Sequence, residues 1–497
     1  MDETQHAQVA FPAGRQFALT WGIPDDFGGM TSALLHRSRA IVRLAGKPVD
    51  LLTFDARPDY PSVDAALRDR GELIDGVRLV NLWDWFRDND AAPDDPGSLD
   101  LVKHPFTPLG ADPAYVSTWR GEHELSRARV DGDATLQVDY FREDGSLLAS
   151  DRRDIDQEGA AGKRSVVLCD REGEPVRSWS GVWAFYRYWL DALRQREPSF
   201  MIVDSKPVAA FMATYQRKRA VVVHVVHSSH LAEEDTESAR LKASRRPVFE
   251  NLEGYDAVVL LTQRQKADVE RLAGVRDNVV VIGNGRELPP AGKEEPRAIG
   301  DGIMLASLTT RKRVDHAVRA IATAAAGHPE LSLDVYGDGP DRDHVAAVVA
   351  ELDAPVRLRG HVPDARELLG GASFLLLTST SEGLPLVLVE SMAVGCIPIA
   401  YDIPYGPADV IQPGKNGYLV PAGDTDAVAR ALDDFLMLSP RKVARLRRNA
   451  RKSAQQFSDL EITRLWSREL RAAAARKAAA WAAREKLAAE KKQNQAG

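Results

Sequence analysis

"TSTSEGLPLVLVESMAVG", residues 378–395, joins the end of an apolar run to a loop and then to an apolar helical segment. Strand, loop and helix in this order are typical of a parallel α/β sheet, whose ligands bind beyond the carboxyl ends of the strands. The stretch also holds two glutamates, Glu382 at the loop tip and Glu390 inside the helix. An unpaired carboxylate is costly to bury, so both acids need a compensating group.

The start of this helix is suited to an anion. Pro385 fits a first helical turn because it lacks an N–H that the turn would leave unpaired, and a hydroxyl of residues 379–381 is expected to cap the helix. Free amides at a helix start favour an anion such as a diphosphate. The amides expected here are those of Gly383, Leu384, Leu386 and Val387. Glu382 would then accept hydrogen bonds from sugar hydroxyls, and Glu390 from a ribose diol. The stretch alone leaves open a plain cap at Glu382 and a solvent-facing Glu390.

Composition limits the class of protein. The chain of 497 residues exceeds the roughly 250–300 that one core supports, so two domains or more are expected. Its 44% hydrophobic and 28% charged residues are typical of a soluble globular protein, and a net charge of −7 argues against a general nucleic-acid binder. Cys169 and Cys396 are too few for a disulfide framework or a zinc cluster. We see no signal-peptide pattern and no run of about 18 apolar residues, so a cytoplasmic protein is expected.

The pattern of a doubly wound α/β domain begins at once and resumes later. A strand (15–22), a Gly-Gly loop leading into a helix, and a second strand (48–55) open it. Short apolar runs, typical of parallel strands covered on both faces, continue it at residues 198–205, 219–230, 255–262 and 278–285. We expect the first domain to comprise residues 1–99 and 183–290.

An antiparallel sheet is expected inside this domain, at residues 100–182. "ATLQVDYFREDGSLLASDRRDI" (134–155) has two β-like runs around an Asp-Gly turn, and residues 165–179 repeat the design. No helix is indicated between them. Because a sheet of hairpins leaves edges that need covering, the insertion predicts a homo-oligomer.

A linker at 288–302 leads to a second open parallel sheet, expected over residues 295–455, and to a basic helix at 456–497. From Arg441 onward the chain has sixteen Lys/Arg and five Asp/Glu, a net charge of about +11. The rest of the chain then has a net charge near −18. Such a tail could contact an anionic polymer or membrane surface, or be only a solvated helix. The cations expected to be exposed on it are Arg471, Arg476, Lys477, Arg484 and Lys486.

"SLTTRKRVDHAVRA" (307–320) follows the first strand of the second domain, where Arg311 and Lys312 could neutralise phosphates. "YGDGPDRD" (336–343) contains Gly-x-Gly but lacks the rest of a dinucleotide fingerprint, so it predicts a tight strand-to-helix turn. "DND" (88–90) does not follow a strand and predicts no metal site.

Several of these motifs, in their spacing, resemble retaining GT-B glycosyltransferases with the E-x7-E signature. They are Lys312, "GHVPD" (360–364), "SEGLPLVLVE" (381–390) and "YDIPYGPADVIQPGKNGYLVPAGD" (401–424). With "GGMTSALLHRSR" (28–39) and the inserted sheet, the chain is similar to bacterial teichoic-acid α-glycosyltransferases over most of residues 15–460. The resemblance implies an α/β fold of two Rossmann-like domains facing a cleft, with the antiparallel insertion in the first. It also implies self-association through that insertion, for example as a trimer.

The resemblance further implies roles for single residues. Glu382 would bind the donor hexose and stabilise an oxocarbenium-like state, Glu390 would hold the ribose, and Lys312 would meet the diphosphate together with the helix amides. His227 would face the hexose across the cleft as a further catalytic residue.

Other donor-binding positions are also implied. Backbone near His361 and Val362 would read the uracil, and Gly28 and Gly29 would let their loop approach the sugar closely. Ser307 stands where the family usually carries an arginine. Either Arg311 or Arg313 then supplies the second charge, or diphosphate binding is weaker.

The implied function is transfer of glucose or N-acetylglucosamine, with retention, from a UDP-sugar to hydroxyls of a polyol-phosphate (wall teichoic acid) polymer. No metal or cofactor is implied, because cations and helix dipoles replace the metal. Same-face attack is favoured over double displacement, since no nucleophile is evident on the opposite face. The alternatives are an O-glycosyltransferase for Ser/Thr-rich protein, a sugar-nucleotide epimerase and an inactive scaffold, the last suggested only by Ser307. We expect a cytoplasmic enzyme with a peripheral contact to the inner membrane face.

Overall fold

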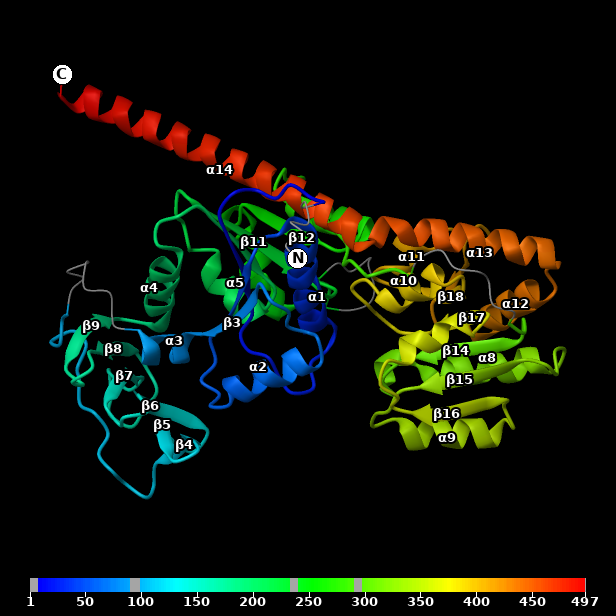
Figure 1. The fold of residues 1–497 in the computed structure, drawn as a ribbon, viewed down its shortest axis with the longest axis horizontal. Coiled ribbons are helices and arrows are strands. Elements are labelled where there is room, and N and C mark those ends of the chain that lie inside the picture. The colour runs from blue at the N-terminus through cyan, green and yellow to red at the C-terminus, as the bar shows by residue number, and fades with distance from the viewer. Residues whose placement is uncertain (1–7, 90–98, 233–239, 290–296, 497) are drawn as a thin grey trace, which may run out of the picture. The chain divides into compact units, whose positions relative to one another are not determined.

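The computed structural model describes residues 8–89, 99–232, 240–289 and 297–496. The chain divides into two compact units (Figure 1). The N-terminal unit consists of Pro12–Val42, Gly46–Val222 and Ala480–Gly497, and the C-terminal unit of Met1–Phe11, Arg43–Ala45 and Val223–Ala479. The domain limits expected from the sequence stay predictions.

The N-terminal unit contains parallel strands in the order β10-β1-β2-β3. Their bounds are β1 Arg15–Leu19, β2 Val49–Thr53, β3 Val77–Asn81 and β10 Ser199–Val203. The helices connected to them are α1 Gly29–Ala45, α2 Tyr60–Asp69, α3 Leu82–Asp88, α4 Val182–Arg194 and α5 Lys206–Met212. All residues of β10 are buried, as its continuous apolar run predicts.

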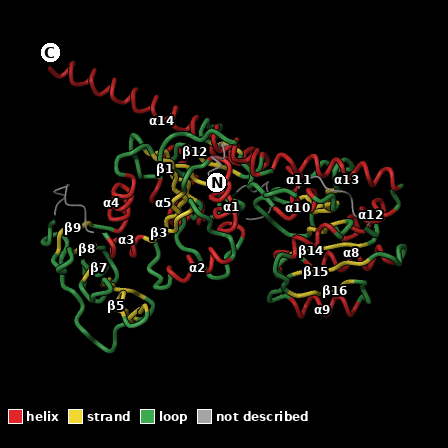
Figure 2. The backbone as a smooth tube through the Cα atoms, in the orientation of Figure 1, coloured by secondary structure: helices red, strands yellow, loops and turns green. Residues whose placement is uncertain are grey.

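The antiparallel sheet expected in this region is present, with six strands paired in chain order (Figure 2). They are β4 Val116–Arg120, β5 His123–Asp131, β6 Ala134–Phe141, β7 Leu147–Arg152, β8 Ser165–Cys169 and β9 Pro175–Trp179. Gly145 turns the β6–β7 hairpin with φ 84°, the left-handed conformation that the Asp-Gly pair predicts. Aromatic rings attach the sheet to the helices before and after it: Trp83 of α3 stacks on Tyr140, with ring centroids 3.5 Å apart.

The C-terminal unit begins within β11 (Ala220–Val226), which pairs in parallel with β12 (Ala257–Leu260), and β12 pairs with β13 (Val279–Val281). Within this unit the strand order is β13-β12-β11. The helical segments beside β12 and β13 are η1 Ala243–Arg245, α6 Arg246–Phe249, η2 Leu252–Gly254 and α7 Gln263–Ala273.

A second parallel sheet in the same unit has the order β16-β15-β14-β17-β18-β19. Its strands are β14 Asp301–Leu305, β15 Ser332–Tyr336, β16 Val356–Gly360, β17 Phe374–Leu377, β18 Ile397–Asp402 and β19 Tyr418–Pro421. The helical segments are η3 Thr310–Lys312, α8 Val314–Ala325, α9 Arg342–Glu351, η4 Ala365–Gly370, α10 Leu386–Ala393, α11 Pro407–Val410, α12 Thr425–Leu436, α13 Pro440–Ala454 and η5 Gln455–Phe457. Because β14 and β17 are central neighbours, the loops that follow them meet at one edge of the sheet.

The long C-terminal helix is α14 (Asp459–Ala496), and the expected row of exposed cations on it is wrong in part. Lys477 is buried and donates to Asp256 at 2.8 Å. Arg476 is half-buried and donates to Glu469 at 2.5 Å. A cation is attracted to a nearby carboxylate, and the charge count of the tail does not reveal which cations have one nearby. Within the described residues, no helix is long and apolar enough to cross a bilayer.

A buried ion pair fixes α1 against the end of β10. Arg37 donates from both terminal nitrogens to Asp204, over 3.0 and 2.6 Å. The side chains are 8% and 0% exposed. The loop of Gly28 and Gly29 leads into this helix, so the ion pair fixes the helix to which the end of the loop is joined.

Arg37→Met should lower the free energy of unfolding by about 3–5 kcal/mol, because it leaves the Asp204 carboxylate buried without its guanidinium. Thermal denaturation of the full chain measures the effect. The control is Arg68→Met, which removes an ion pair with Asp64 whose side chains are 39% and 30% exposed; little change is expected there. Equal melting temperatures for the two variants would contradict the assignment.

Candidate functional site

Two cations compensate the first of the two glutamates. Lys312, at the end of η3, donates to Oε1 of Glu382 at 2.6 Å, and Arg311 donates to the same oxygen at 3.1 Å. The side chains of Lys312 and Glu382 are only 17% and 14% exposed, so the bond is shielded from water. Arg311 also donates to the carbonyl of Ser381 at 2.9 Å. The basic loop after β14 and the acidic loop after β17 therefore neutralise each other.

The backbone of Glu382 is clamped by the segment "YDIPYGP". The amide of Glu382 donates to the carbonyl of Pro404 at 3.1 Å, and the amide of Tyr405 donates back to the carbonyl of Glu382 at 3.0 Å. Tyr405 is fully buried, and its hydroxyl donates to Asp268 at 2.7 Å. Burial, with the hydrogen bond to Asp268, raises the pKa of Tyr405. The position of Glu382 thus depends on Tyr405 as its anchor. The sequence places this tyrosine in a motif but predicts no role for it.

His230 belongs to the same anchor. Its ring stacks on that of Tyr405 with centroids 5.8 Å apart and an interplanar angle of 8°. Burial lowers the pKa of His230 to about 4, so the ring stays neutral near pH 7. A buried, stacked and neutral imidazole acts as a packing group.

Gly383 brings the loop against the end of β11. A Cβ atom at Gly383 would lie 2.1 Å from the carbonyl oxygen of His227, closer than any real contact. Only glycine fits this approach. The predicted residues His227 and Glu382 are therefore held near one another through their backbones, and the side chain of His227 is half-buried.

The second glutamate is neither solvent-facing nor unpaired. Glu390, on α10, accepts a hydrogen bond at 2.7 Å from Nε of Arg286, and the side chains are 19% and 13% exposed. Backbone bonds fix Arg286: its amide donates to Phe457 at 2.9 Å and its carbonyl accepts from Asp459 at 3.1 Å. Sequence reasoning missed Arg286. The available signal was an arginine directly after the "NG" turn that ends the β13 run.

The start of α10 differs from expectation in its cap. Pro385 is the N-cap residue, the helix begins at Leu386, and no side chain caps it, so the predicted cap from residues 379–381 is wrong. The chain reaches the helix from the clamp at Glu382, which keeps those hydroxyls away from the first turn. Among the described residues, none accepts a hydrogen bond from the four predicted amides. They are those of Gly383, Leu384, Leu386 and Val387.

Two family models match parts of this chain. Residues 301–453 match the family model "Glycosyl transferases group 1", and residues 122–285 match "Glycosyl transferase 4-like domain". A solved structure of S. aureus TarM, a variant in complex with fondaparinux, alpha-GlcNAc-glycerol and UDP, aligns with a TM-score of 0.65 at 20% identity, covering 92% of this chain and 99% of that one. The chain is a GT-B glycosyltransferase. The predicted fold class, including the antiparallel sheet, is confirmed.

Three curated relatives are similar to this glycosyltransferase over most of its length. Poly(ribitol-phosphate) alpha-N-acetylglucosaminyltransferase of Staphylococcus aureus (strain COL) is 24% identical, over 79% of this chain and 86% of the relative. The GtfA subunit of the UDP-N-acetylglucosamine–peptide N-acetylglucosaminyltransferase of Streptococcus gordonii is 26% identical, over 72% and 71%. Poly(glycerol-phosphate) alpha-glucosyltransferase of Bacillus subtilis (strain 168) is 21% identical, over 91% and 74%.

Three further predicted residues lie at the same edge of the second sheet. Ser307 follows β14 and is exposed. His361 and Val362 follow β16, two strands from β14 in the sheet order. "YGDG" makes the predicted tight turn, and it packs on the Ser307 loop: a Cβ at Gly337 would lie 1.9 Å from the carbonyl oxygen of Ala306.

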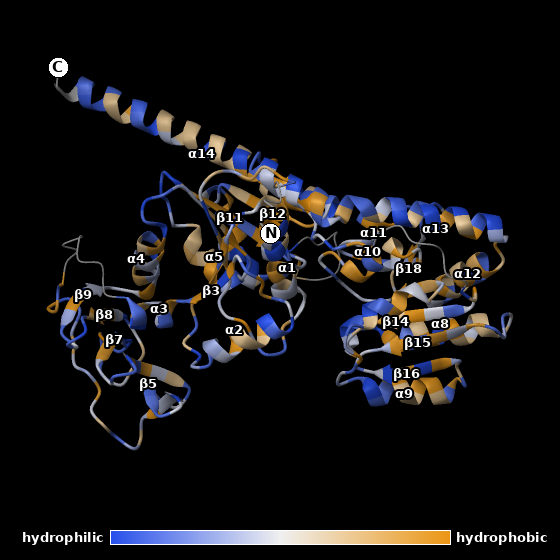
Figure 3. Cartoon of the chain, viewed as in Figure 1, coloured by the Kyte–Doolittle hydropathy of each residue, from blue (hydrophilic) through white to orange (hydrophobic). Residues whose placement is uncertain are grey.

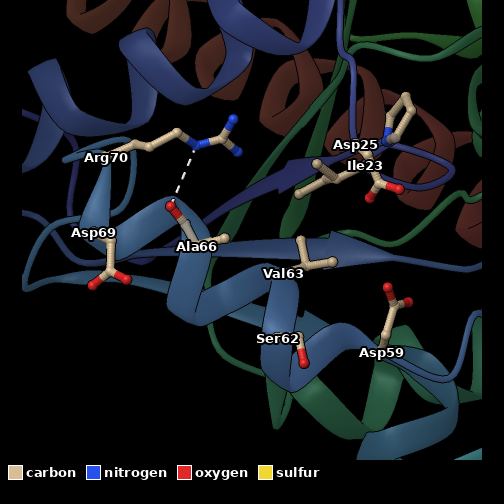
Figure 4. A pocket seen from close by; sticks show the side chains of 9 residues that line it. Ile23, Asp25, Asp59, Ser62, Val63, Ala66, Asp69 and Arg70 are labelled. Atoms are coloured by element: carbon tan, nitrogen blue, oxygen red, sulfur yellow. Dashed lines mark hydrogen bonds between the residues drawn. The ribbon is translucent and has the colours of Figure 1, made fainter.

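Gly28 and Gly29 line a cavity of about 530 Å³ in the N-terminal unit. Asp55 also lines it, and burial raises the pKa of this carboxyl although Tyr60 donates a hydrogen bond to it. A neighbouring cavity of about 550 Å³ is lined by Ile23, Pro24, Asp25, Asp59, Ser62, Val63, Ala66, Asp69 and Arg70 (Figure 4). Three aspartates against one arginine make that second cavity unsuited to a polyanion.

Within the described residues, no three His, Cys, Asp or Glu side chains lie close enough together to hold a metal ion. Independence from metal stays a prediction.

Gly383→Ala should impair transfer strongly and lower the melting temperature, because the new methyl group meets the carbonyl of His227 and displaces the loop of Glu382. Overpacking of this kind costs about 1–3 kcal/mol. Gly370→Ala is the matched control, since a Cβ there meets nothing within 4 Å. Normal activity of Gly383→Ala would show that the loop need not touch β11.

Proposed function

We propose that this glycosyltransferase moves glucose or N-acetylglucosamine from a UDP-sugar to a hydroxyl of a polyol-phosphate polymer, with retention at the anomeric carbon. The observation that carries the proposal is the pair of cation-neutralised glutamates flanking a helix start with free amides. Two relatives support the acceptor by their names, as transferases acting on poly(ribitol-phosphate) and poly(glycerol-phosphate). UDP in the TarM complex supports the donor.

Donor binding would exchange ion-pair partners at Glu382. A diphosphate beside the free amides attracts Lys312 and Arg311, whose present partner is the carboxylate. Glu382 is then released to accept hydrogen bonds from hexose hydroxyls. Arg311, which is 49% exposed, can turn toward the diphosphate and supply the charge absent at Ser307.

The ribose would bind at Glu390. Arg286 occupies Oε1 of this carboxylate, so Oε2 remains able to accept from a ribose diol. We assign Arg286 as a positioning residue, because its guanidinium orients the carboxylate while its own backbone is fixed on both sides. His361 and Val362 remain our candidates for the uracil, and Gly28 and Gly29 for the approach to the sugar.

The chemistry requires the bond from the anomeric carbon to the phosphate oxygen to break and a bond to the acceptor oxygen to form on the same face. The acceptor proton passes to the departing phosphate oxygen. Lys312 and the α10 amides would stabilise the charge that develops on the diphosphate, and Glu382 the charge on the sugar ring. His227 would border the sugar from the other side. None of these groups requires a metal.

A second acceptor class has its own support. The S. gordonii relative is named as a peptide N-acetylglucosaminyltransferase and is slightly more identical in sequence than the polymer-modifying ones. A Ser/Thr-rich protein is therefore the second candidate acceptor, and an epimerase would release UDP with no acceptor at all.

The acceptor assay offers UDP-glucose and UDP-N-acetylglucosamine with poly(glycerol-phosphate), poly(ribitol-phosphate) and a Ser/Thr-rich peptide, each with and without EDTA. We expect labelled hexose on a polymer, α-linked and unaffected by EDTA, and a turnover about a hundredfold lower for Glu382→Gln. Transfer to peptide alone would support the second candidate. UDP release without any glycosylated product would overturn both.

Self-association and membrane contact are proposals too. Val116 and Trp119 of the edge strand β4 are 56% and 53% exposed. These exposed apolar side chains support the proposal that a second copy of the chain covers this edge.

The role of Arg286 can be separated from mere stability by comparing UDP with 2′-deoxy-UDP in titration calorimetry. The wild type should prefer UDP by about ten- to a hundredfold, the value of a hydrogen bond to a charged group. Arg286→Met and Glu390→Gln should both bring this ratio close to one.

Arg43→Met is the control, since it breaks the exposed bond from Arg43 to Glu287, the residue next to Arg286. Its ratio should match the wild type. If Arg286→Met weakens both nucleotides equally, Arg286 only stabilises the fold and the ribose assignment fails.

A further inference from the structure

α13 carries a row of cations to which no described residue is paired. Arg441, Lys442, Arg445, Arg448 and Lys452 are all exposed, and we call them the basic face. No described residue forms an ion pair with any of the five. The helix contains no acidic residue at all. Figure 3 colours much of this helix as hydrophilic.

The opposite face of α13 is fixed in the C-terminal unit. Val443, Leu446 and Ala450 are buried, and α13 packs against α10, the helix of Glu390. Arg447 also lies on this inner side, 8% exposed, and donates to the hydroxyl of Ser373 at 3.0 Å. The basic face is thus presented outward by a rigid helix that covers the proposed donor-binding helix.

The basic face is unfavourable for the helix itself. Arg441, Arg445, Arg448 and Lys452 are spaced by four, three and four residues, so like charges stack along one side. Arg441 and Lys442 also lie in the first turn, where the helix dipole favours acids. Like charges stacked on one helix face, with no acid on the helix to offset them, disfavour the helix. Such a conflict between sequence and local stability is typical of a functional surface.

The α14 tail shows the contrast. Three of its cations donate to residues outside the helix: Lys477 to the carboxylate of Asp256, Arg476 to the carbonyl of Asp256, and Arg471 to the carbonyl of Ala10. Beyond these it exposes Arg484, Lys486, Lys491 and Lys492, interrupted by Glu485 and Glu490. α13 therefore presents a row of exposed cations with no acid on its own helix, whereas the exposed cations of α14 stand next to Glu485 and Glu490.

We propose that the basic face of α13 is a docking site for the phosphodiester backbone of the acceptor polymer, away from the hydroxyl that receives the sugar. The inference rests on the proposed polymer acceptor. Successive cations of the row lie about one helical turn apart, over roughly 16 Å in all, a line suited to a linear polyanion. An anionic membrane is the less suited partner, because the apolar face of α13 is buried in the protein and cannot insert between lipids.

The test variant is Arg441→Gln/Arg445→Gln/Arg448→Gln/Lys452→Gln. Its control removes the same charge from the tail, as Arg484→Gln/Lys486→Gln/Lys491→Gln/Lys492→Gln. For the α13 variant at low salt, the KM for long polymer should rise about tenfold or more, as expected for several exposed charge contacts. The KM values for the UDP-sugar and for a single-repeat glycerol-phosphate acceptor should stay within about twofold of wild type, because neither reaches α13.

Salt supplies an independent readout. The logarithm of wild-type affinity for long polymer should fall linearly with the logarithm of salt concentration, and the α13 variant should lose a slope of about 2–3. The tail control should keep both the affinity and the slope. An unchanged polymer KM in the α13 variant, or the same loss in the tail control, would overturn the proposal.

Direct binding of fluorescent poly(glycerol-phosphate) separates this inference from the proposed function. Loss of binding in the α13 variant supports the docking site even if no hexose is transferred to that polymer. Wild-type polymer binding in the variant, together with lost binding to phosphatidylglycerol vesicles, would identify a membrane surface instead and overturn it.

Discussion

The candidate site depends on the bond from Lys312 to Glu382, which pairs a carboxylate that is only 14% exposed with a cation. It follows from strand order, because the central neighbours β14 and β17 end side by side. Backbone contacts fix the register of the two loops: the hydroxyl of Thr378 donates to the carbonyl of Arg313 at 2.8 Å, and the amide of Thr380 to that of Arg311 at 2.8 Å. The position of Lys312 is therefore set by the sheet.

The fold was predictable because its signals are local. Continuous apolar runs indicate buried parallel strands, and an Asp-Gly turn between β-like runs indicates a hairpin, wherever they occur. The acids of the candidate site, Glu382 and Glu390, could be chosen by a local argument too, since a glutamate in an apolar segment conflicts with its surroundings.

The partners of those acids were less accessible. Arg286 and Glu390 lie 104 positions apart, and no periodicity links them. Their meeting depends on the backbone bonds of Arg286 with residues 457–459, far along the chain. The same reason explains the misjudged cations of α14: composition reports that Lys477 is charged, but only the fold places it beside Asp256.

The clamp on Glu382 has a kinetic consequence. Under the proposed function, the nucleotide product would still carry the diphosphate that attracts Lys312 after the glycosyl group has left, and tight retention would stall the enzyme. Glu382, fixed by Pro404 and Tyr405, remains within reach to reclaim its cation as the sugar departs. The carboxylate that we propose to stabilise the reacting sugar would thus also compete with the product diphosphate for Lys312, and this competition would speed product release before the next cycle.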